Sequence, residues 1–254
     1  MIFDTHIHLD HFSSEFDVAV EVEAARQAGV SQFLLPGVDQ PGWQNIQTIA
    51  DRFDGVQAAF GLHPQAADQW NEDCRKALMA LLREGKAVAI GEIGLDRTID
   101  VPVLLQEQAF REQLQVAIEF SLPVLIHCRK VPGRLLEILR EEKTDLVGGI
   151  MHAFGGSYQT ARAAIDLGFV LSFGGALTYP EARRAIEVVR QLPDDAIVVE
   201  TDAPDLAPHP HRGKPNRPLW ISLVVQRLAE IRGWSFEQTV EITTANAQRV
   251  LQMY

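Results

Sequence analysis

The stretch that organises this sequence reads Ile2-Phe3-Asp4-Thr5-His6-Ile7-His8. Its apolar and polar residues alternate with the two-residue period of a β-strand, which places Asp4, His6 and His8 on one face. Two imidazoles at the C-terminal end of a rigid strand form half of a site for a divalent metal ion. A surface strand with solvated histidines has the same pattern, so the rest of the chain must decide between the two interpretations.

Short runs rich in Val, Ile and Leu alternate with helical patterns along the chain, as expected of parallel strands that are buried on both faces. Eight strands, each followed by a helix, predict an α/β fold, a (β/α)8 TIM barrel that forms a single domain over residues 1–254. A doubly wound open sheet is the alternative, but it usually has fewer strands and a glycine-rich first turn, which residues 4–9 lack. The predicted strands are 2–8, 31–36, 56–61, 87–93, 123–128, 148–152, 169–173 and 196–201, and the predicted helices before residue 192 are 15–28, 43–52, 72–84, 102–120, 132–142, 157–167 and 180–191.

The composition limits the class of protein. A hydrophobic share of 46% is ample for a core, and the two cysteines, Cys74 and Cys128, provide neither a disulfide framework nor a thiolate metal cluster. No apolar run reaches the length of a membrane span, and the first strand follows Met1 directly. We therefore expect no signal peptide, no membrane association and a cytoplasmic protein. The net charge of −11 argues against binding nucleic acid through bulk electrostatics, so a polyanionic substrate would need a local basic patch.

Histidines and carboxylates stand at the ends of the predicted strands, where TIM barrels carry their chemistry. They are His6 and His8 on the first strand, His63 on the third, Glu92 on the fourth, His127 on the fifth, His152 on the sixth and Asp202 on the eighth. Each could separately be a satisfied core residue or a capping group, but together they predict a metal site. Imidazole and carboxylate ligands without thiolate suit Zn, Mn, Fe or Co, and they admit Mg.

The number of candidate ligands favours two divalent ions per chain. Six potential ligands exceed what one tetrahedral ion uses, so two ions bridged by a carboxylate and a water are expected. Glu92 is central in strand order and is the natural bridge, whereas the choice among Zn, Mn, Mg and Co stays open. The six predicted ligands are His6, His8, Glu92, His127, His152 and Asp202.

Six motifs follow one another along the chain: Asp4-Thr5-His6-Ile7-His8-Leu9-Asp10, Gly61-Leu62-His63-Pro64, Gly91-Glu92-Ile93-Gly94-Leu95-Asp96, Ile126-His127-Cys128-Arg129, His152-Ala153-Phe154-Gly155-Gly156 and Glu200-Thr201-Asp202-Ala203-Pro204. In this order they resemble the motifs of the TatD family of metal-dependent hydrolases, which includes the TatD-type deoxyribonucleases and belongs to the amidohydrolase superfamily. The match spans residues 4–204 and continues through Asn216-Arg217-Pro218 to Thr244-Ala245-Asn246-Ala247. A lone His-x-His would be weak, but the ordered set is highly specific.

The resemblance implies a barrel with two divalent ions, and phosphodiester cleavage in DNA as the best-known activity. It implies that one ion is held by His6, His8, Glu92 and Asp202, and the other by Glu92, His127 and His152. His63 would lie beside the substrate phosphate, and Arg129 would face it. Strand parity agrees, because it puts Arg129 on the same face as His127.

The residues expected to face the substrate depart from the family pattern more than the ligands do. Gln65 stands where the family often has a second histidine, Arg97-Thr98 replaces a loop that often begins with an aromatic residue, and Arg217 replaces an acidic residue. The resemblance therefore implies an intact set of metal ligands beside an altered substrate surface.

A basic loop follows the eighth strand and reads His209-Pro210-His211-Arg212-Gly213-Lys214-Pro215-Asn216-Arg217. Together with Arg129, Lys130 and Arg134 it would form a local basic patch on the catalytic rim to which a polyanion could bind. The alternatives are a solvated loop stiffened by prolines and, for Arg129, an ion pair with a nearby carboxylate. The aromatic residues that could stack bases there, each of which could equally lie in the core, are Phe154, Tyr179 and Trp220.

We expect a hydrolase in which a metal-activated water attacks phosphorus or a carbonyl carbon. Asp202 would move the proton and Arg129 would bind a phosphate oxygen pair, with Glu92 and His63 completing the catalytic set. The first hypothesis is a deoxyribonuclease acting on DNA or another phosphodiester, and the alternative is a hydrolase of a small ester, amide or lactone. The ligand set disfavours a third hypothesis, a non-catalytic metal-binding or scaffold protein, and no obligate protein partner is indicated.

Overall fold

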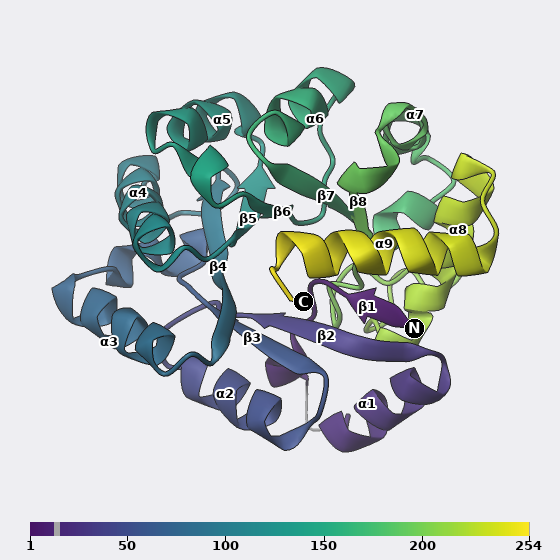
Figure 1. Cartoon of the computed structure of the whole chain (residues 1–254), viewed down its shortest axis with the longest axis horizontal. Helices are drawn as coiled ribbons and strands as arrows, with labels where there is room; N and C mark the ends of the chain where they lie inside the picture. The colour runs from purple at the N-terminus through teal and green to yellow at the C-terminus, as the bar shows by residue number, and fades with distance from the viewer. Residues whose placement is uncertain (13–15, 254) are drawn as a thin grey trace.

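The computed structural model of the chain describes residues 1–12 and 16–253. Within them, eight parallel strands alternate with α-helices, which confirms the predicted TIM-barrel fold; Figure 1 shows the helices arranged in a ring around the strands. The strands are β1 (Ile2–Asp4), β2 (Val30–Pro36), β3 (Val56–Phe60), β4 (Ala87–Asp96), β5 (Val124–Arg129), β6 (Gly149–Met151), β7 (Phe169–Phe173) and β8 (Ile197–Val199). The α-helices are α1 (Val18–Gln27), α2 (Trp43–Arg52), α3 (Glu72–Arg83), α4 (Val103–Phe120), α5 (Pro132–Glu141), α6 (Tyr158–Ile165), α7 (Arg183–Gln191), α8 (Ile221–Arg232) and α9 (Phe236–Val250).

The sheet runs in chain order from β1 to β8, and each neighbouring pair is parallel. Hydrogen bonds beyond the regular ladders join β8 to β1. The Thr5 backbone N–H donates to the Val199 carbonyl at 3.1 Å. The buried Asp4 carboxylate accepts one bond from the Thr201 N–H at 2.8 Å and another from its hydroxyl at 2.6 Å. The first and last strands are thereby held side by side.

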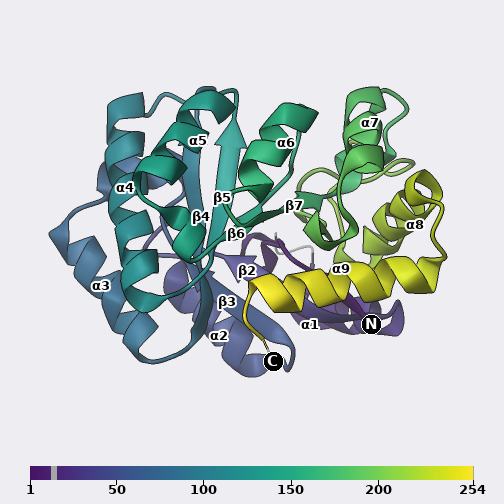
Figure 2. The same cartoon turned by 45° about the horizontal axis from the view of Figure 1, so that its top comes forward.

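The barrel interior is filled by one apolar side chain from each strand. The set is Phe3, Leu34, Ala59, Ala89, Leu125, Ile150, Val170 and Val198. Helix α9 closes the N-terminal end of the barrel, because Ala247, Val250 and Leu251 pack against this interior cluster. Figures 1 and 2 both show α9 lying across the strand ends. A sealed N-terminal end leaves the opposite end for chemistry.

The structure differs from the predicted element bounds at the N-terminus. Strand β1 ends at Asp4, so His6 and His8 lie beyond it rather than within a strand over residues 2–8. The ladder stops there because the backbone turns to both neighbours: Thr5 bonds to β8, and the Ile7 N–H donates to the Leu34 carbonyl of β2 at 3.1 Å. The predicted helix start at residue 15 lies outside the described residues. The described helix α1 follows Asp17, whose carboxylate caps the Ala19 and Val20 N–H groups.

Strand β4 is longer than predicted and places Glu92 in its middle instead of near its end. The register shifts between Ile90 and Ile93, after which β4 continues to pair with β5 as far as Asp96. Gly94 has a φ of +147° and lies so close to β5 that a Cβ atom would sit 2.0 Å from the His127 carbonyl oxygen. Only glycine permits this approach.

The segment after β8 also goes beyond the prediction, since two helices, α8 and α9, follow it instead of one. Helix α9 begins with a capping box in which Ser235 and Gln238 bond each other's backbone N–H groups. None of the described helices is long and apolar enough to cross a membrane.

Asn246 fastens α9 to the barrel, and its removal tests how much this closure contributes to stability. Its amide donates to the Asp194 carbonyl at 2.7 Å and to the buried Ile197 carbonyl at 2.9 Å. Asn246→Ala removes both donors, so we expect the free energy of unfolding measured in urea to fall by about 1–3 kcal/mol. The exposed Glu241→Ala change on the same helix is the control and should stay within about 0.5 kcal/mol of wild type. Equal free energies of unfolding for the two variants would contradict a stabilising role of the Asn246 hydrogen bonds.

Candidate metal centre

The six predicted ligands meet at the C-terminal end of the barrel. His6 and His8 follow β1, Glu92 lies in β4, His127 lies in β5, His152 follows β6, and Asp202 follows β8. Their side chains are 1%, 9%, 4%, 16%, 7% and 13% exposed in that order, so six polar groups share a largely dehydrated space.

Glu92 lies at the middle of this cluster and turns its two oxygens to two different groups. Oε2 lies 3.2 Å from His6 Nε2 and 3.8 Å from His8 Nε2. Asp202 Oδ1 joins the same group, 3.8 Å from His6 Nε2 and 3.7 Å from His8 Nε2. Four potential donor atoms, from β4 and from the segments after β1 and β8, therefore lie close together.

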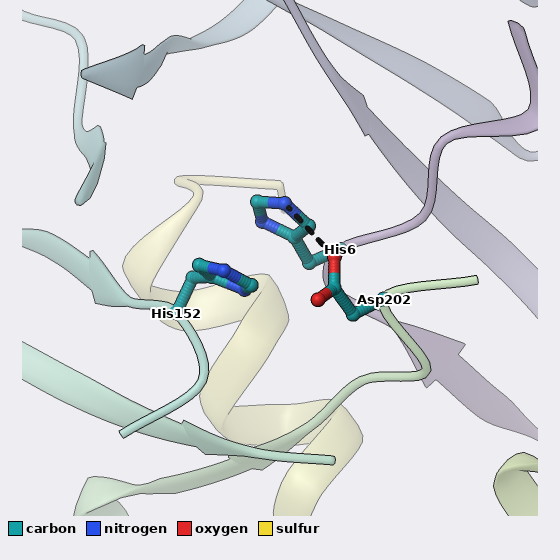
Figure 3. Close-up of side chains that lie close together, drawn as sticks. All are labelled: His6, His152 and Asp202. Carbon is teal, nitrogen blue, oxygen red and sulfur yellow. Dashed lines mark ion pairs between the residues drawn. The ribbon is translucent and has the colours of Figure 1, made fainter. Parts of the chain in front are cut away.

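The second group forms around the other oxygen of Glu92. His127 Nδ1 lies 2.7 Å from Glu92 Oε1, His152 Nε2 lies 3.6 Å from it, and His63 Nε2 lies 3.9 Å from it. The two groups adjoin, because the rings of His6 and His152 stack with their centroids 3.8 Å apart. Figure 3 shows His6, His152 and Asp202 converging from three separate strand ends, with the His6–Asp202 pair dashed.

Backbone hydrogen bonds between the segments after β1 and β8 hold the first group. The Asp202 N–H donates to the His6 carbonyl at 2.9 Å, and the His8 N–H donates to the Ala203 carbonyl at 2.8 Å. The buried Asn216 amide donates to the Thr201 carbonyl at 2.8 Å. Asp4, which the alternation placed with His6 and His8, makes its strongest contacts with Thr201 and supports this segment.

Two buried carboxylates next to the ligands were not predicted as site residues. Asp96 Oδ2 lies 3.2 Å from His127 Nε2, and Glu200 Oε1 lies 3.1 Å from His152 Nδ1. Asp96 also accepts from the Thr98 N–H and hydroxyl, and Glu200 accepts from the Ala153 N–H. Such outer carboxylates orient metal-binding imidazoles. Strand parity could have found Asp96, four positions after Glu92 and so on the same face of β4.

His63 differs from the other histidines in its hydrogen bonds. Its Nδ1 accepts the Gln65 backbone N–H at 3.1 Å, so the neutral ring carries its proton on Nε2. Burial lowers the pKa of His63 to about 4, which keeps the ring neutral. The Nε2–H group that faces Glu92 is thus a hydrogen-bond donor, as required of a residue beside a substrate oxygen.

Burial determines the charge of the first group. It lowers the pKa of His6, and it lowers the pKa of His8 well below the usual value, so both imidazoles are neutral. Burial by itself would raise the pKa of Glu92, but the imidazoles of His6, His152 and His63 lower it well below its ordinary range. Burial raises the pKa of Asp202 well above the usual value.

The carboxylates around His152 raise the pKa of its ring, whereas burial lowers the pKa of His6 and His8. Burial would lower the pKa of this ring, but Glu200, Glu92 and Asp202 outweigh it and raise the pKa to about 10. The same negative field favours a metal cation beside the ring.

The donor set fits divalent cations. His6 Nε2 and His8 Nε2 lie 3.3 Å apart and face the same carboxylate oxygen, so neutral imidazole lone pairs and anionic oxygens converge. Neutral His6 and His8 and ionised Glu92 have the protonation states that metal binding requires, whereas a bound cation would have to displace the proton of His152 and favour the ionised form of Asp202. Donor atoms lie within 4.8 Å of one another in three sets around this centre, which are His6 with His8 and Glu92, His6 with His152 and Asp202, and His63 with Glu92 and His127.

The centre opens into a cleft with a volume of about 960 Å³. His63, Gln65, Arg129 and Phe154 are among the residues that line it. Arg129 is exposed at the end of β5, and no described carboxylate lies within 4.0 Å of its guanidinium group, so it does not form the ion pair considered as its alternative.

The arginines of the basic loop after β8 are not free, as a patch that binds a polyanion would need them to be. Arg217 forms a two-pronged ion pair with the buried Glu21 of α1, both distances being 2.9 Å. Arg212 pairs with Glu181 and lies over the Tyr179 ring. Lys214 lines a separate, smaller hollow. Both arginines therefore have carboxylate partners of their own, and polyanion binding by the loop stays a prediction.

Arg134 is neutralised in the same way, since it pairs with Glu107 at 2.7 Å and with Glu137 at 3.3 Å. Among the three candidate aromatics, only Phe154 lines the main cleft. The Tyr179 hydroxyl donates to the Ala207 carbonyl, and the Trp220 ring stacks on His211.

Known proteins are similar to this chain over nearly its whole length. Residues 3–252 match the family described as "TatD related DNase". The uncharacterized metal-dependent hydrolase YabD of Bacillus subtilis is 38% identical and covers 100% of both chains. The 3'-5' ssDNA/RNA exonuclease TatD of Cronobacter sakazakii is 34% identical and covers 98% of this chain and 97% of its own.

The crystal structure of the TatD homologue YjjV from Escherichia coli K12 superimposes with a TM-score of 0.93 at 31% identity. The superposition covers 100% of this chain and 98% of YjjV. The family match, the identities and the shared barrel agree with the motifs. This chain therefore belongs to the TatD family of metal-dependent hydrolases.

Proposed function

We propose that this enzyme cleaves phosphodiester bonds in DNA and uses two divalent ions to do so. The observation that carries the proposal is the placement of Glu92, whose two oxygens face two separate groups of histidines. In this position Glu92 would help to hold both ions, and two-ion sites are suited to displacement at phosphorus. The exonuclease name of the Cronobacter relative supports a nucleic acid as the substrate.

Bound divalent ions would supply an activated water and neutralise charge on the phosphate. His6, His8, Glu92 and Asp202 would hold one ion, and Glu92, His127 and His152 would hold the other. Asp96 and Glu200 would orient His127 and His152 through their remaining ring nitrogens.

The remaining side chains would act on the substrate itself. Arg129 would bind the scissile phosphate through paired N–H groups, and His63 would donate its Nε2–H to a phosphate oxygen. Asp202 would accept the proton of the attacking water and return it to the leaving oxygen as the P–O bond breaks. The cleavage then consumes one water and yields an alcohol and a phosphate monoester.

One observation favours the second candidate, hydrolysis of a small ester, amide or lactone. Ion pairs neutralise Arg212 and Arg217, so the loop after β8 contributes less to polyanion binding than its sequence indicates. A small neutral substrate would need none of these charges.

Glu92→Gln tests the two-ion centre. The change keeps the shape of the side chain but removes the charge that both ions would share. We expect wild type to bind close to two equivalents of Zn²⁺ or Mn²⁺, and the variant to bind both ions at least about tenfold more weakly. Equilibrium dialysis with elemental analysis measures this directly. Glu107→Gln removes a carboxylate on α4 and should bind like wild type. Saturation of wild type at one equivalent would contradict the model.

Arg129→Ala distinguishes a phosphodiesterase from a carbonyl hydrolase. Loss of a charged hydrogen bond to phosphate costs roughly 10- to 100-fold, so kcat/KM on single-stranded DNA should fall by about that factor while the metal content stays unchanged. Arg134→Ala removes a cation that is already paired with Glu107 and should cleave DNA like wild type. An enzyme that cleaves neutral esters but not DNA, and tolerates Arg129→Ala, would be the second candidate instead.

A further inference from the structure

Three cations that line the main cleft have no carboxylate partner in the described chain. They are Arg129 at the end of β5, Lys130 directly after it, and Arg184 in the first turn of α7. All three are exposed, and none makes an ion pair within 4.0 Å among residues 1–12 and 16–253. Lys130 and Arg184 are not needed to hold the ions or the scissile phosphate, so their charges call for another explanation.

Three cations close to the cleft but outside its lining are already paired. Arg134, Arg212 and Arg217 lie nearby in the fold, but each of them pairs with a glutamate. Positive charge that is left free in the cleft is therefore available to an anionic ligand.

The free cations lie along one side of the cleft. Lys130 precedes α5 and Arg184 belongs to α7, while the segment from Ala153 to Thr160 between them lines the cleft before and within the start of α6. Helices α5, α6 and α7 stand next to one another in both Figure 1 and Figure 2. The segment after β8 lines the cleft with the exposed carboxylate of Asp205, which repels phosphates.

We propose that Lys130 and Arg184 bind phosphates that flank the scissile one, so that a single-stranded nucleic acid lies along the α5–α7 side of the cleft and not over the loop after β8. The inference rests on the proposed function, because it assumes a substrate with several phosphates. Arg129 binds the central phosphate in this arrangement. The enzyme then prefers oligonucleotides to dinucleotides and to small phosphodiesters.

The test compares two double variants that remove the same charge. Lys130→Gln with Arg184→Gln removes the two free cations, and Arg134→Gln with Arg212→Gln removes two paired ones. KM is measured for the dinucleotide TpT and for a thymidylate hexamer over a range of salt concentrations, with the metal-loaded enzymes. We expect the wild-type KM to be about tenfold lower for the hexamer than for TpT.

The first double variant should lose this advantage, and its slope of log KM against log salt should be flatter by about 1.4 units, or roughly 0.7 for each lost contact on a single strand. The second double variant should keep both the advantage and the slope.

If the two double variants behave alike while wild type cleaves the hexamer, the flanking sites are refuted and the nuclease function stands. If Lys214→Gln abolishes the length advantage instead, the strand passes over the loop after β8 and the proposal is wrong. If wild type cleaves neither oligonucleotide, the proposed function fails and the inference fails with it.

Discussion

Closure of the barrel between β1 and β8 is the constraint on which the metal centre depends. His6 and Asp202 are separated by most of the chain, and they meet only because the first and last strands are neighbours. The buried Asp4 carboxylate holds this seam through two hydrogen bonds to Thr201. Asn216 braces the same segment from the other side. Asp4, which the alternation groups with His6 and His8, therefore stabilises the contact between the segments that carry the predicted ligands.

Burial gives the site its chemistry as well as its shape. Neutral imidazoles and anionic carboxylates are rarely buried together without compensation, because each group loses its water. Here burial keeps His6 and His8 neutral, while the surrounding histidines keep Glu92 ionised. These are protonation states that bind a divalent cation, so burial prepares His6, His8 and Glu92, whereas a bound ion would have to displace the proton of His152 and ionise Asp202.

The fold and the ligand positions could be predicted because both depend on local patterns. Alternation and strand order indicate where a side chain points, and the six predicted ligands lie together at one end of the barrel, although His6 and His8 lie beyond β1 and Glu92 lies within β4. The two carboxylates behind His127 and His152 were missed because a buried acid next to a ligand has no distinctive spacing, although parity from Glu92 does reach Asp96. The end of β1 was also not predicted, because the backbone after Asp4 forms hydrogen bonds with both β8 and β2.

Ion pairing is the property that the sequence alone could not predict. Arg217 and Glu21 are 196 positions apart, and only the packing of the loop after β8 against α1 shows that they meet. A cluster of basic residues in a sequence therefore indicates local positive charge, but it does not show whether those side chains are free to bind an anion. Arg129 lies in a less conspicuous stretch and is unpaired at the cleft, whereas the basic loop is largely neutralised. In an acidic protein, cations at the cleft that lack carboxylate partners among the described residues contribute to the field that an anionic substrate meets, and Arg129, Lys130 and Arg184 lie beside the candidate metal centre.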